Sequence, residues 1–421
     1  MLVNKVRAIM GNRLSRNLGW LGLGQVFMRV SRLGTTVVLA RMFSQYDYGL
    51  ISIVYTCQAF AQVFTMGSLG GGVSAKIVEA KAEDLETVCN TTYWVSWMLC
   101  ILVCVIQCIA AFPIAWFYDA PEVFWPIFVL SFMYLMFPVF KVHGGLIQRE
   151  NRLKITALGI TLREMANNII TVIFALLGFG VWSVVFGLLL SAPVWIVVNY
   201  RNHTWRPPRK ITFEKGREIL QFGLSMMGVE FMDKLRLNID YLIVGRFLGV
   251  DALGLYFLAF NAGLGISKQV INSTMVALFP HLCAERDDKA QLKKQYKASL
   301  KQVGFVIIPL VLLQSSLAPF YVPIVFGQKW VPAVPILITI CLSAIPLAFG
   351  LASYQLLNAV GKINLTLKWN LIYTGLFTAV ILAAVSFGVY WVAIAVFICQ
   401  CFNLMFSIWA FRHVFAKPQV S

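Results

Sequence analysis

The sequence has few charged residues and lacks any long polar segment that could form a domain in water. Only 13% of its 421 residues are charged, whereas 59% are hydrophobic; ordinary soluble domains have roughly 25% and 45–50%. This composition excludes a water-soluble fold. The chain also lacks a Walker A sequence and an HExxH motif, so neither ATP hydrolysis nor zinc-dependent hydrolysis is supported. We expect an integral membrane protein that is not an enzyme.

Histidine is scarce, and cysteine forms no recognisable framework. The 4 histidines have no metal-ligand spacing, and the 9 cysteines fall mostly in apolar stretches without loop-borne pairs. We therefore expect no metal site. Gly67 and the run Gly70-Gly-Gly form a glycine-rich segment, which favours a hinge or a closely packed helix end over a phosphate-binding loop.

Charge-poor runs mark the membrane-spanning helices, because an unpaired charge in hydrocarbon is costly. At about 20 to 25 residues per crossing, the chain holds on the order of a dozen crossings. The predicted fold class is therefore an all-α integral membrane protein with about twelve transmembrane helices. The predicted spans are 18–40, 49–72, 91–114, 123–140, 155–177, 180–200, 218–245, 252–279, 302–326, 331–357, 369–387 and 389–411.

The distribution of lysine and arginine orients these spans, since cytoplasmic loops retain an excess of positive charge. With the N-terminus in the cytoplasm, 26 of the 35 basic residues fall in inner loops and tails, 3 in outer turns and 6 within spans. Both termini are therefore predicted to be cytoplasmic. Most of the net charge of +17 then reflects topology, so nucleic-acid binding is not expected.

The two halves of the sequence resemble each other. An offset of 205 residues maps Arg41 onto Arg246 and Gly49 onto Gly254, each near the turn between the first two spans of its half. Six spans per half with the same sidedness predict two six-helix bundles related by a parallel pseudo-repeat. The predicted domains are an N-terminal lobe (1–199), a basic cytoplasmic linker (200–217) and a C-terminal lobe (218–421).

Ionisable residues within spans are the strongest functional signal, because each must be paired or face a watery cavity. Arg29 and Arg32 share a helical face, and two adjacent like charges favour an anionic ligand. The seventh span contains two possible i, i+4 ion pairs, Glu230–Lys234 and Arg236–Asp240. The candidate substrate-binding cations are Arg29, Arg32, Arg163, Lys234, Arg236 and Lys268. The candidate acidic residues for ion coupling or charge balance are Glu164, Glu230, Asp233 and Asp240.

These charges have a simpler alternative explanation, because long basic side chains near a span end can reach the membrane interface. That alternative stays open for Arg163 and Lys268, and for the arginines of the first span if that span begins early. It fits the seventh span less well, where the charges are spread over eleven positions. Away from the span ends, the spans contain 6 basic and 4 acidic residues, which suits a hydrophilic, anionic substrate.

Several short motifs lie at predicted turns and helix ends. They are Leu39-Ala-Arg-Met-Phe, Tyr48-Gly-Leu, Leu146-Ile-Gln-Arg-Glu-Asn-Arg, Ile243-Val-Gly-Arg-Phe-Leu-Gly, Gly254-Leu-Tyr, Leu278-Phe-Pro and Val322-Pro-Ile-Val-Phe-Gly-Gln-Lys-Trp followed by Pro332 and Pro335. None is catalytic, and each is weak alone. As a set they make nearly the whole chain resemble the polysaccharide transporter family of the multidrug, oligosaccharidyl-lipid and polysaccharide (MOP) exporter superfamily, especially Wzx-type flippases similar to the colanic acid and teichuronic acid exporters.

The resemblance implies a MATE-like, two-lobed helical bundle that alternates between inward-open and outward-open forms. It implies that the chain carries an undecaprenyl-pyrophosphate-linked oligosaccharide across the inner membrane of a bacterium for O-antigen, capsule or exopolysaccharide synthesis. Arg29 and Arg32 occupy the region in which related flippases have substrate-binding basic residues. The implied partners are membrane lipids and the polymerase, chain-length regulator and glycosyltransferases of polysaccharide assembly. No cofactor is expected other than a coupling H⁺ or Na⁺.

Two other functions remain open from the sequence. A multidrug or other small-solute exporter of the same superfamily would share the fold, although a cationic interior repels cationic drugs. A membrane polymerase or a scaffold of polysaccharide assembly is the second alternative. Polymerases usually present catalytic groups on sizeable outer loops, whereas the longest predicted outer loop here is 115–122, with Asp119 and Glu122 as its carboxylates.

Overall fold

The described part of the chain is entirely helical apart from its connections. The computed structural model describes residues 28, 31–207 and 211–415, and within these ranges it contains helices and turns but no β-strand. The predicted all-α class is confirmed. The chain divides into two compact units, the first ending at Asn238 and the second beginning at Ile239.

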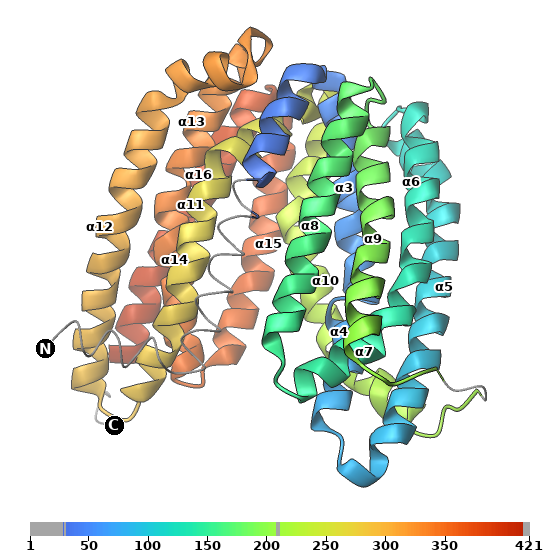
Figure 1. The fold of residues 1–421 in the computed structure, drawn as a ribbon. Helices are drawn as coiled ribbons and strands as arrows, with labels where there is room; N and C mark the ends of the chain where they lie inside the picture. Colours follow the sequence, from blue (N-terminus) through green and yellow to red (C-terminus); the bar gives the residue numbers. More distant parts are fainter. Residues whose placement is uncertain (1–27, 29–30, 208–210, 416–421) are drawn as a thin grey trace, which may run out of the picture. The chain divides into compact units, whose positions relative to one another are not determined.

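Within each unit, long helices run side by side (Figure 1). The first unit contains the helical residues 31–42, α3 (Gln45–Thr65), α4 (Ser68–Glu79), η1 (Ala82–Asp84), α5 (Leu85–Phe117), η2 (Pro121–Val123), α6 (Phe124–Ser131), η3 (Phe132–Met136), α7 (Phe137–Arg149), α8 (Leu153–Leu176), α9 (Trp182–Asn202) and most of α10 (Gly216–Leu248). The second unit contains the end of α10, α11 (Val250–Ala284), α12 (Lys289–Tyr321), η4 (Val322–Phe326), η5 (Gln328–Ala333), α13 (Val334–Leu342), α14 (Ala344–Ala359), α15 (Ile363–Val385) and α16 (Val389–Phe415).

Seven helical segments in the described ranges are long and apolar enough to cross a membrane. They are Ala82–Phe117, Pro121–Arg149, Trp182–Asn202, Lys289–Phe326, Gln328–Ala359, Ile363–Val385 and Val389–Phe415. An eighth is added if the two parts of α11, which meet at an angle of 44°, form one span. The predicted number of about twelve spans and the predicted orientation remain predictions.

The other predicted spans are helical but are not among these segments. They correspond to residues 31–42, the pair α3–α4, α8 and α10. Three of these four segments carry the candidate charged residues, and the bent α11 carries Lys268. A helix with ionisable residues along its length must pack against protein or line a hydrated space in order to cross a membrane. The helices least suited to contact lipid are therefore those that hold the candidate site.

Apolar side chains are exposed along the outer face of α5. Ile109, Phe112 and Trp116 are 70%, 71% and 74% exposed. An apolar surface of this kind would be costly in water but is the normal surface of a protein in lipid. We infer that this face contacts the membrane.

The second helix of each half begins where the internal offset predicts. α3 begins at Gln45 and α11 at Val250, which is a separation of 205 residues. The start of α3 is fixed by a capping box between Ser44 and Asp47. Before α11, Gly249 has a φ of +87°, a conformation in which side chains with a Cβ are strained. This glycine is the last residue of the motif that begins at Ile243.

The boundary between the two compact units lies inside a helix. α10 begins at Gly216, next to the predicted linker, and continues without a break past the boundary at Asn238 and Ile239. The first part of α10 packs on α4, where the backbone of Gly223 would contact a Cβ on Gly72 at 3.1 Å. This close approach agrees with the closely packed helix end that the glycine-rich segment predicts.

The second predicted span is broken between α3 and α4. At the break, a buried cation donates a hydrogen bond to a backbone carbonyl at the end of α3. The Lys141 ammonium on α7, which is 5% exposed, donates to the carbonyl of Thr65 at 2.7 Å. At the other end of α4, Arg149 Nη1 donates to the carbonyls of Ile77 and Val78 at 2.9 and 3.2 Å. Positive charges at helix C-termini are favourable, because the last carbonyls carry partial negative charge.

These two cations correct a sequence-based prediction. Lys141 and Arg149 were expected in a cytoplasmic loop after a span ending at residue 140, whereas α7 continues to Arg149. Their long side chains reach backbone carbonyls of the neighbouring broken helix, and this contact satisfies both the cation and the helix end. Their charge therefore has a structural role as well as its contribution to topology.

We expect Gly249→Ala to lower the free energy of unfolding by about 1 to 2 kcal/mol, because a Cβ is strained at positive φ. The measurement is the thermal midpoint of the purified protein in detergent. Gly228→Ala is the matched control, because Gly228 lies within α10 and a Cβ there would have no neighbour within 4 Å. An equal loss of stability in the two variants would contradict the assigned backbone conformation.

We expect Lys141→Met to lower the free energy of unfolding by about 1 to 3 kcal/mol, because it leaves the buried Thr65 carbonyl without its recorded donor. Lys81→Met is the control, since the Lys81 side chain is 79% exposed. Comparison of the thermal midpoints in the same detergent tests the assignment. It fails if Lys141→Met is as stable as the wild type.

Candidate functional site

Four residues from three helical segments form a polar cluster in the first unit. Arg163 Nη1 on α8 pairs with Glu164 Oε1 at 3.1 Å. Glu164 and Arg32, which lies in the helical residues 31–42, both lie near enough to Tyr55 on α3 for their charges to affect the ionisation of its hydroxyl group. We call Arg32, Tyr55, Arg163 and Glu164 the Tyr55 cluster. The structure therefore brings together residues that are distant in sequence.

The helices around the Tyr55 cluster are held by further contacts. Asn168 Nδ2 on α8 donates to Ser31 Oγ at 3.1 Å, which joins α8 to the helical residues 31–42. The guanidinium carbon of Arg163 lies 5.4 Å from the ring centre of Trp195 on α9. A cation at this distance from an aromatic face is attracted by the ring. Arg163 is thus fixed between a carboxylate and an indole.

The Tyr55 cluster has an excess of positive charge and of buried polar groups. Two arginines face one glutamate, and the Arg163 side chain is only 13% exposed. Among the described residues, the Nε–H donor of Arg163 is buried without a hydrogen-bond partner. Buried polar groups are rarely left unpaired in folded proteins. This combination is suited to an anionic ligand with several acceptor oxygens.

The acidic and basic residues of α10 within the first unit form a second group. Arg236 Nη2 pairs with Asp233 Oδ1 at 2.9 Å, three residues earlier in the helix. Arg236 does not pair with Asp240, so the predicted i, i+4 pair is wrong; positions three apart are also neighbours on a helix. Lys234 is half-buried, and its backbone carbonyl accepts from Asn238 at 2.7 Å.

Glu230 lies at the break between α3 and α4. A Cβ on Gly67 would meet the carboxylate at the flexible end of the Glu230 side chain, which would have to move away. Gly67 is the N-cap residue of α4 and provides no side-chain cap. A carboxylate near a helix N-terminus is stabilised by the partial positive charge of the first amide groups. The Glu230 carboxylate therefore lies where it complements the positive end of α4.

Asp240 and Lys268 lie in the second unit. Asp240 is 2% exposed and accepts a hydrogen bond from the Tyr256 hydroxyl at 2.7 Å. Its Oδ1 atom is buried and has no hydrogen-bond partner among the described residues. Lys268 is half-buried in α11, directly after the bend. These two residues belong to a different compact unit from the Tyr55 cluster.

At the bend in α11, a neutral side chain forms hydrogen bonds with the backbone carbonyls before the bend. Gln314 Nε2 on α12 donates to the carbonyls of Ala262 and Gly263 at 2.7 and 2.8 Å. Ser267 Oγ donates to the Gln314 side-chain oxygen at 3.1 Å. One amide side chain therefore contacts both sides of the bend.

Arg29 lies outside the described residues, and sequence reasoning missed several residues that hold the site. Trp195 and Tyr256 contact candidate charges, and Tyr55 lies near two of them, yet an aromatic residue in an apolar helix looks like ordinary packing. The motif Gly254-Leu-Tyr provided a signal for Tyr256, because it places a tyrosine hydroxyl one turn into α11. No comparable signal identified Tyr55 or Trp195.

The fold is similar to those of solved transporters. An inward-facing MATE-family multidrug transporter of the MOP superfamily aligns with a TM-score of 0.77 at 16% identity, covering 94% of this chain and 96% of the other. The lipid II flippase MurJ in an inward closed conformation aligns with a TM-score of 0.74 at 14% identity, covering 94% and 89%. At these identities the likeness concerns the fold.

Sequence relatives act in polysaccharide synthesis. Succinoglycan biosynthesis transport protein ExoT of Rhizobium meliloti is 25% identical over 363 residues, which is 85% of this chain and 72% of ExoT. Lipopolysaccharide biosynthesis protein WzxC of Escherichia coli is 24% identical over 392 residues, with coverage of 92% and 78%. Teichuronic acid biosynthesis protein TuaB of Bacillus subtilis is 23% identical, with coverage of 88% and 76%.

The resemblance inferred from the motifs is confirmed at the level of the family. The match to the family model described as polysaccharide biosynthesis protein extends over residues 38–335, well over half of the chain. This range includes Tyr55, Arg163, Glu164, the broken pair α3–α4 and Asp240, whereas Arg32 lies before it. The chain therefore belongs to the polysaccharide biosynthesis protein family and has the fold of MOP-superfamily transporters.

Proposed function

We propose that this protein moves an undecaprenyl-pyrophosphate-linked oligosaccharide from the cytoplasmic to the outer leaflet of a bacterial inner membrane, for synthesis of a surface or secreted polysaccharide. Family membership supports the pathway, and ExoT, a named transport protein, supports translocation. The fold shared with the flippase MurJ supports a lipid-linked cargo. In this proposal the protein is not an enzyme, and its N- and C-termini are cytoplasmic.

The observation that carries this proposal is the Tyr55 cluster. A diphosphate has to lose water as it enters a membrane protein, and fixed cations in a low dielectric compensate for that loss. Arg32 and Arg163 provide two guanidinium groups, and Glu164 offsets one positive charge. In the proposed mechanism they bind the diphosphate, while the lipid tail remains in the bilayer.

The transport step that we propose is alternating access between the two compact units. α10 is continuous through the boundary between them, so a movement of one unit would be transmitted along that helix. Arg29, Lys234, Arg236 and Lys268 are proposed as further cations along the substrate path. Membrane lipids and the polymerase, chain-length regulator and glycosyltransferases are the proposed partners.

Asp240 is the best-placed residue for coupling to H⁺ or Na⁺. Glu164, Asp233 and Glu230 each have a local role, opposite Arg163, opposite Arg236 and at the start of α4. Asp240 is buried and is held by an uncharged tyrosine hydroxyl. A buried carboxylate that accepts from a neutral hydroxyl, with the Lys268 charge acting on it from α11, can change its protonation during a cycle.

Deletion of the gene should cause lipid-linked repeat units to accumulate facing the cytoplasm. The measurement is labelling of the oligosaccharide by a membrane-impermeant lectin in right-side-out and inverted vesicles, with the intact gene as control. Normal outward presentation without polymer would contradict translocation and favour the polymerase or scaffold alternative. Outward transport of small cationic dyes with normal lipid-linked sugars would instead favour a multidrug exporter.

Arg32→Ala should reduce export at least tenfold, because a charge-assisted contact to phosphate contributes about 1.5 to 3 kcal/mol. Arg32→Lys should retain part of the activity, since it keeps the charge and loses the planar fork. Arg217→Ala is the matched control, because it removes one exposed arginine near the predicted linker. Full export by Arg32→Ala at normal protein levels would refute a role for this arginine.

A further inference from the structure

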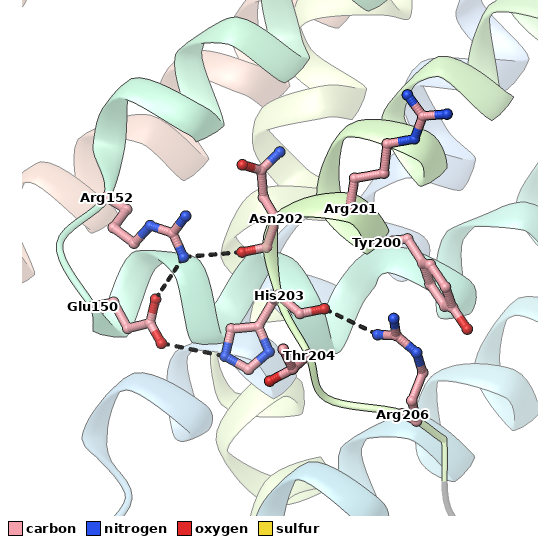
Figure 2. Close-up of a pocket in the computed structure, with 8 residues that line it drawn as sticks. All are labelled: Glu150, Arg152, Tyr200, Arg201, Asn202, His203, Thr204 and Arg206. Carbon is pink, nitrogen blue, oxygen red and sulfur yellow. Dashed lines mark hydrogen bonds and ion pairs between the residues drawn. The ribbon is translucent and has the colours of Figure 1, made fainter.

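A pocket of about 320 Å³ lies in the first unit, where the connection from α7 to α8 meets the end of α9 (Figure 2). It shares no residue with the Tyr55 cluster and lies on the predicted cytoplasmic side. Three arginines and one carboxylate give its lining an excess of two positive charges if the histidine is neutral. The lining residues are Glu150, Arg152, Tyr200, Arg201, Asn202, His203, Thr204 and Arg206.

The only carboxylate of the pocket is fully engaged. Glu150 Oε2 pairs with Arg152 Nη1 at 3.0 Å, and Oε1 lies 3.3 Å from His203 Nε2 (Figure 2). The backbone amide of Trp205 donates to His203 Nδ1 at 3.0 Å, so a neutral His203 carries its proton on Nε2 and donates it to Glu150. With both oxygens of Glu150 engaged, the carboxylate is not directed at a ligand.

Two of the three arginines, Arg206 and Arg152, are ordered by backbone and aromatic contacts. Arg206 Nη1 donates to the carbonyls of His203 and Trp205 at 3.0 and 2.8 Å, and its guanidinium carbon lies 4.0 Å from the ring centre of Tyr200. Arg152 Nη1 also donates to the carbonyl of Asn202 at 2.9 Å. These bonds use one nitrogen of each guanidinium, and each group has five N–H donors.

Topology alone does not explain this arrangement. Retention of positive charge on the cytoplasmic side requires arginines in the loops but does not require them to be fixed around a cavity. Ordered guanidinium groups match the oxygen geometry of phosphate. The volume lies at the small end of the range of about 300 to 1,000 Å³ for ligand pockets, so it suits a phosphate or a lipid head group.

We propose that this pocket binds a phosphate group at the cytoplasmic face, supplied by the head group of an anionic membrane lipid or by a soluble phosphate compound. Arg206 and Arg152 form the ordered part of the site. Arg201, whose side chain is exposed in the same pocket, adds the second excess charge. The proposal does not depend on the identity of the transported substrate.

Two binding measurements on the full-length protein distinguish the two sources. In the first, native mass spectrometry counts the lipids retained from nanodiscs that contain phosphatidylethanolamine with or without phosphatidylglycerol. In the second, calorimetry follows a titration of inorganic phosphate in nanodiscs of phosphatidylethanolamine alone. A lipid site predicts retained phosphatidylglycerol, and a site for soluble phosphate predicts heat of phosphate binding.

The double variant Arg201→Gln/Arg206→Gln should weaken the observed binding at least tenfold, because it removes two charge-assisted contacts. Arg217→Gln/Arg286→Gln is the matched control, since it removes the same charge from exposed positions on the predicted cytoplasmic side. Because Arg206 also orders the chain, Arg201→Gln alone is the second variant and should weaken binding with an unchanged thermal midpoint. Equal binding by the pocket and control variants, or no binding of either probe by the wild type, would overturn the proposal.

Discussion

The hydrocarbon core of a membrane contains no water to accept or donate a hydrogen bond, and the rest of this structure depends on that constraint. Wherever a helix is interrupted, its freed carbonyl groups need a donor from the protein. The break between α3 and α4 receives the ammonium of Lys141. The bend in α11 receives the amide of Gln314. Both of these interruptions are therefore paired with a long polar side chain on a neighbouring helix of the same unit.

The same constraint separates the helices into two kinds. α5 has no charged residue after Glu86 and exposes residues such as Phe112 and Trp116. α8 and α10 carry ion pairs within their length, and these charges are tolerated because other charges or rings surround them. Arg163 illustrates the energetic cost of a charge within a span, since both Glu164 and Trp195 contact its guanidinium group. Such expensive arrangements are typical of positions with a function in transport.

Periodic features of the sequence predicted the positions of the helices well. They did not predict the contacts between helices. Charge-poor runs located the helical stretches, and the 205-residue offset located the starts of α3 and α11. Hydropathy could not detect that Lys141 is buried, because a lysine near a span end normally marks a loop. The partner of Arg236 was also mispredicted, since helical spacing allows a partner three or four residues away and the side-chain conformation decides. The glycine-rich segment did indicate the break at Gly67, where a side chain would meet Glu230.

The two interrupted helices occupy similar places in the two halves, yet their joints differ in stiffness. The α3–α4 joint is held by a full positive charge that is covalently attached to α7, so moving it apart would leave an ammonium and a carbonyl stranded in a low dielectric. The α11 bend is held by a neutral amide, which can exchange partners at much lower cost. Straightening or further bending is therefore cheaper in α11 than at the first joint. The two halves have a similar order of helices. The same force would nevertheless bend the second half more than the first.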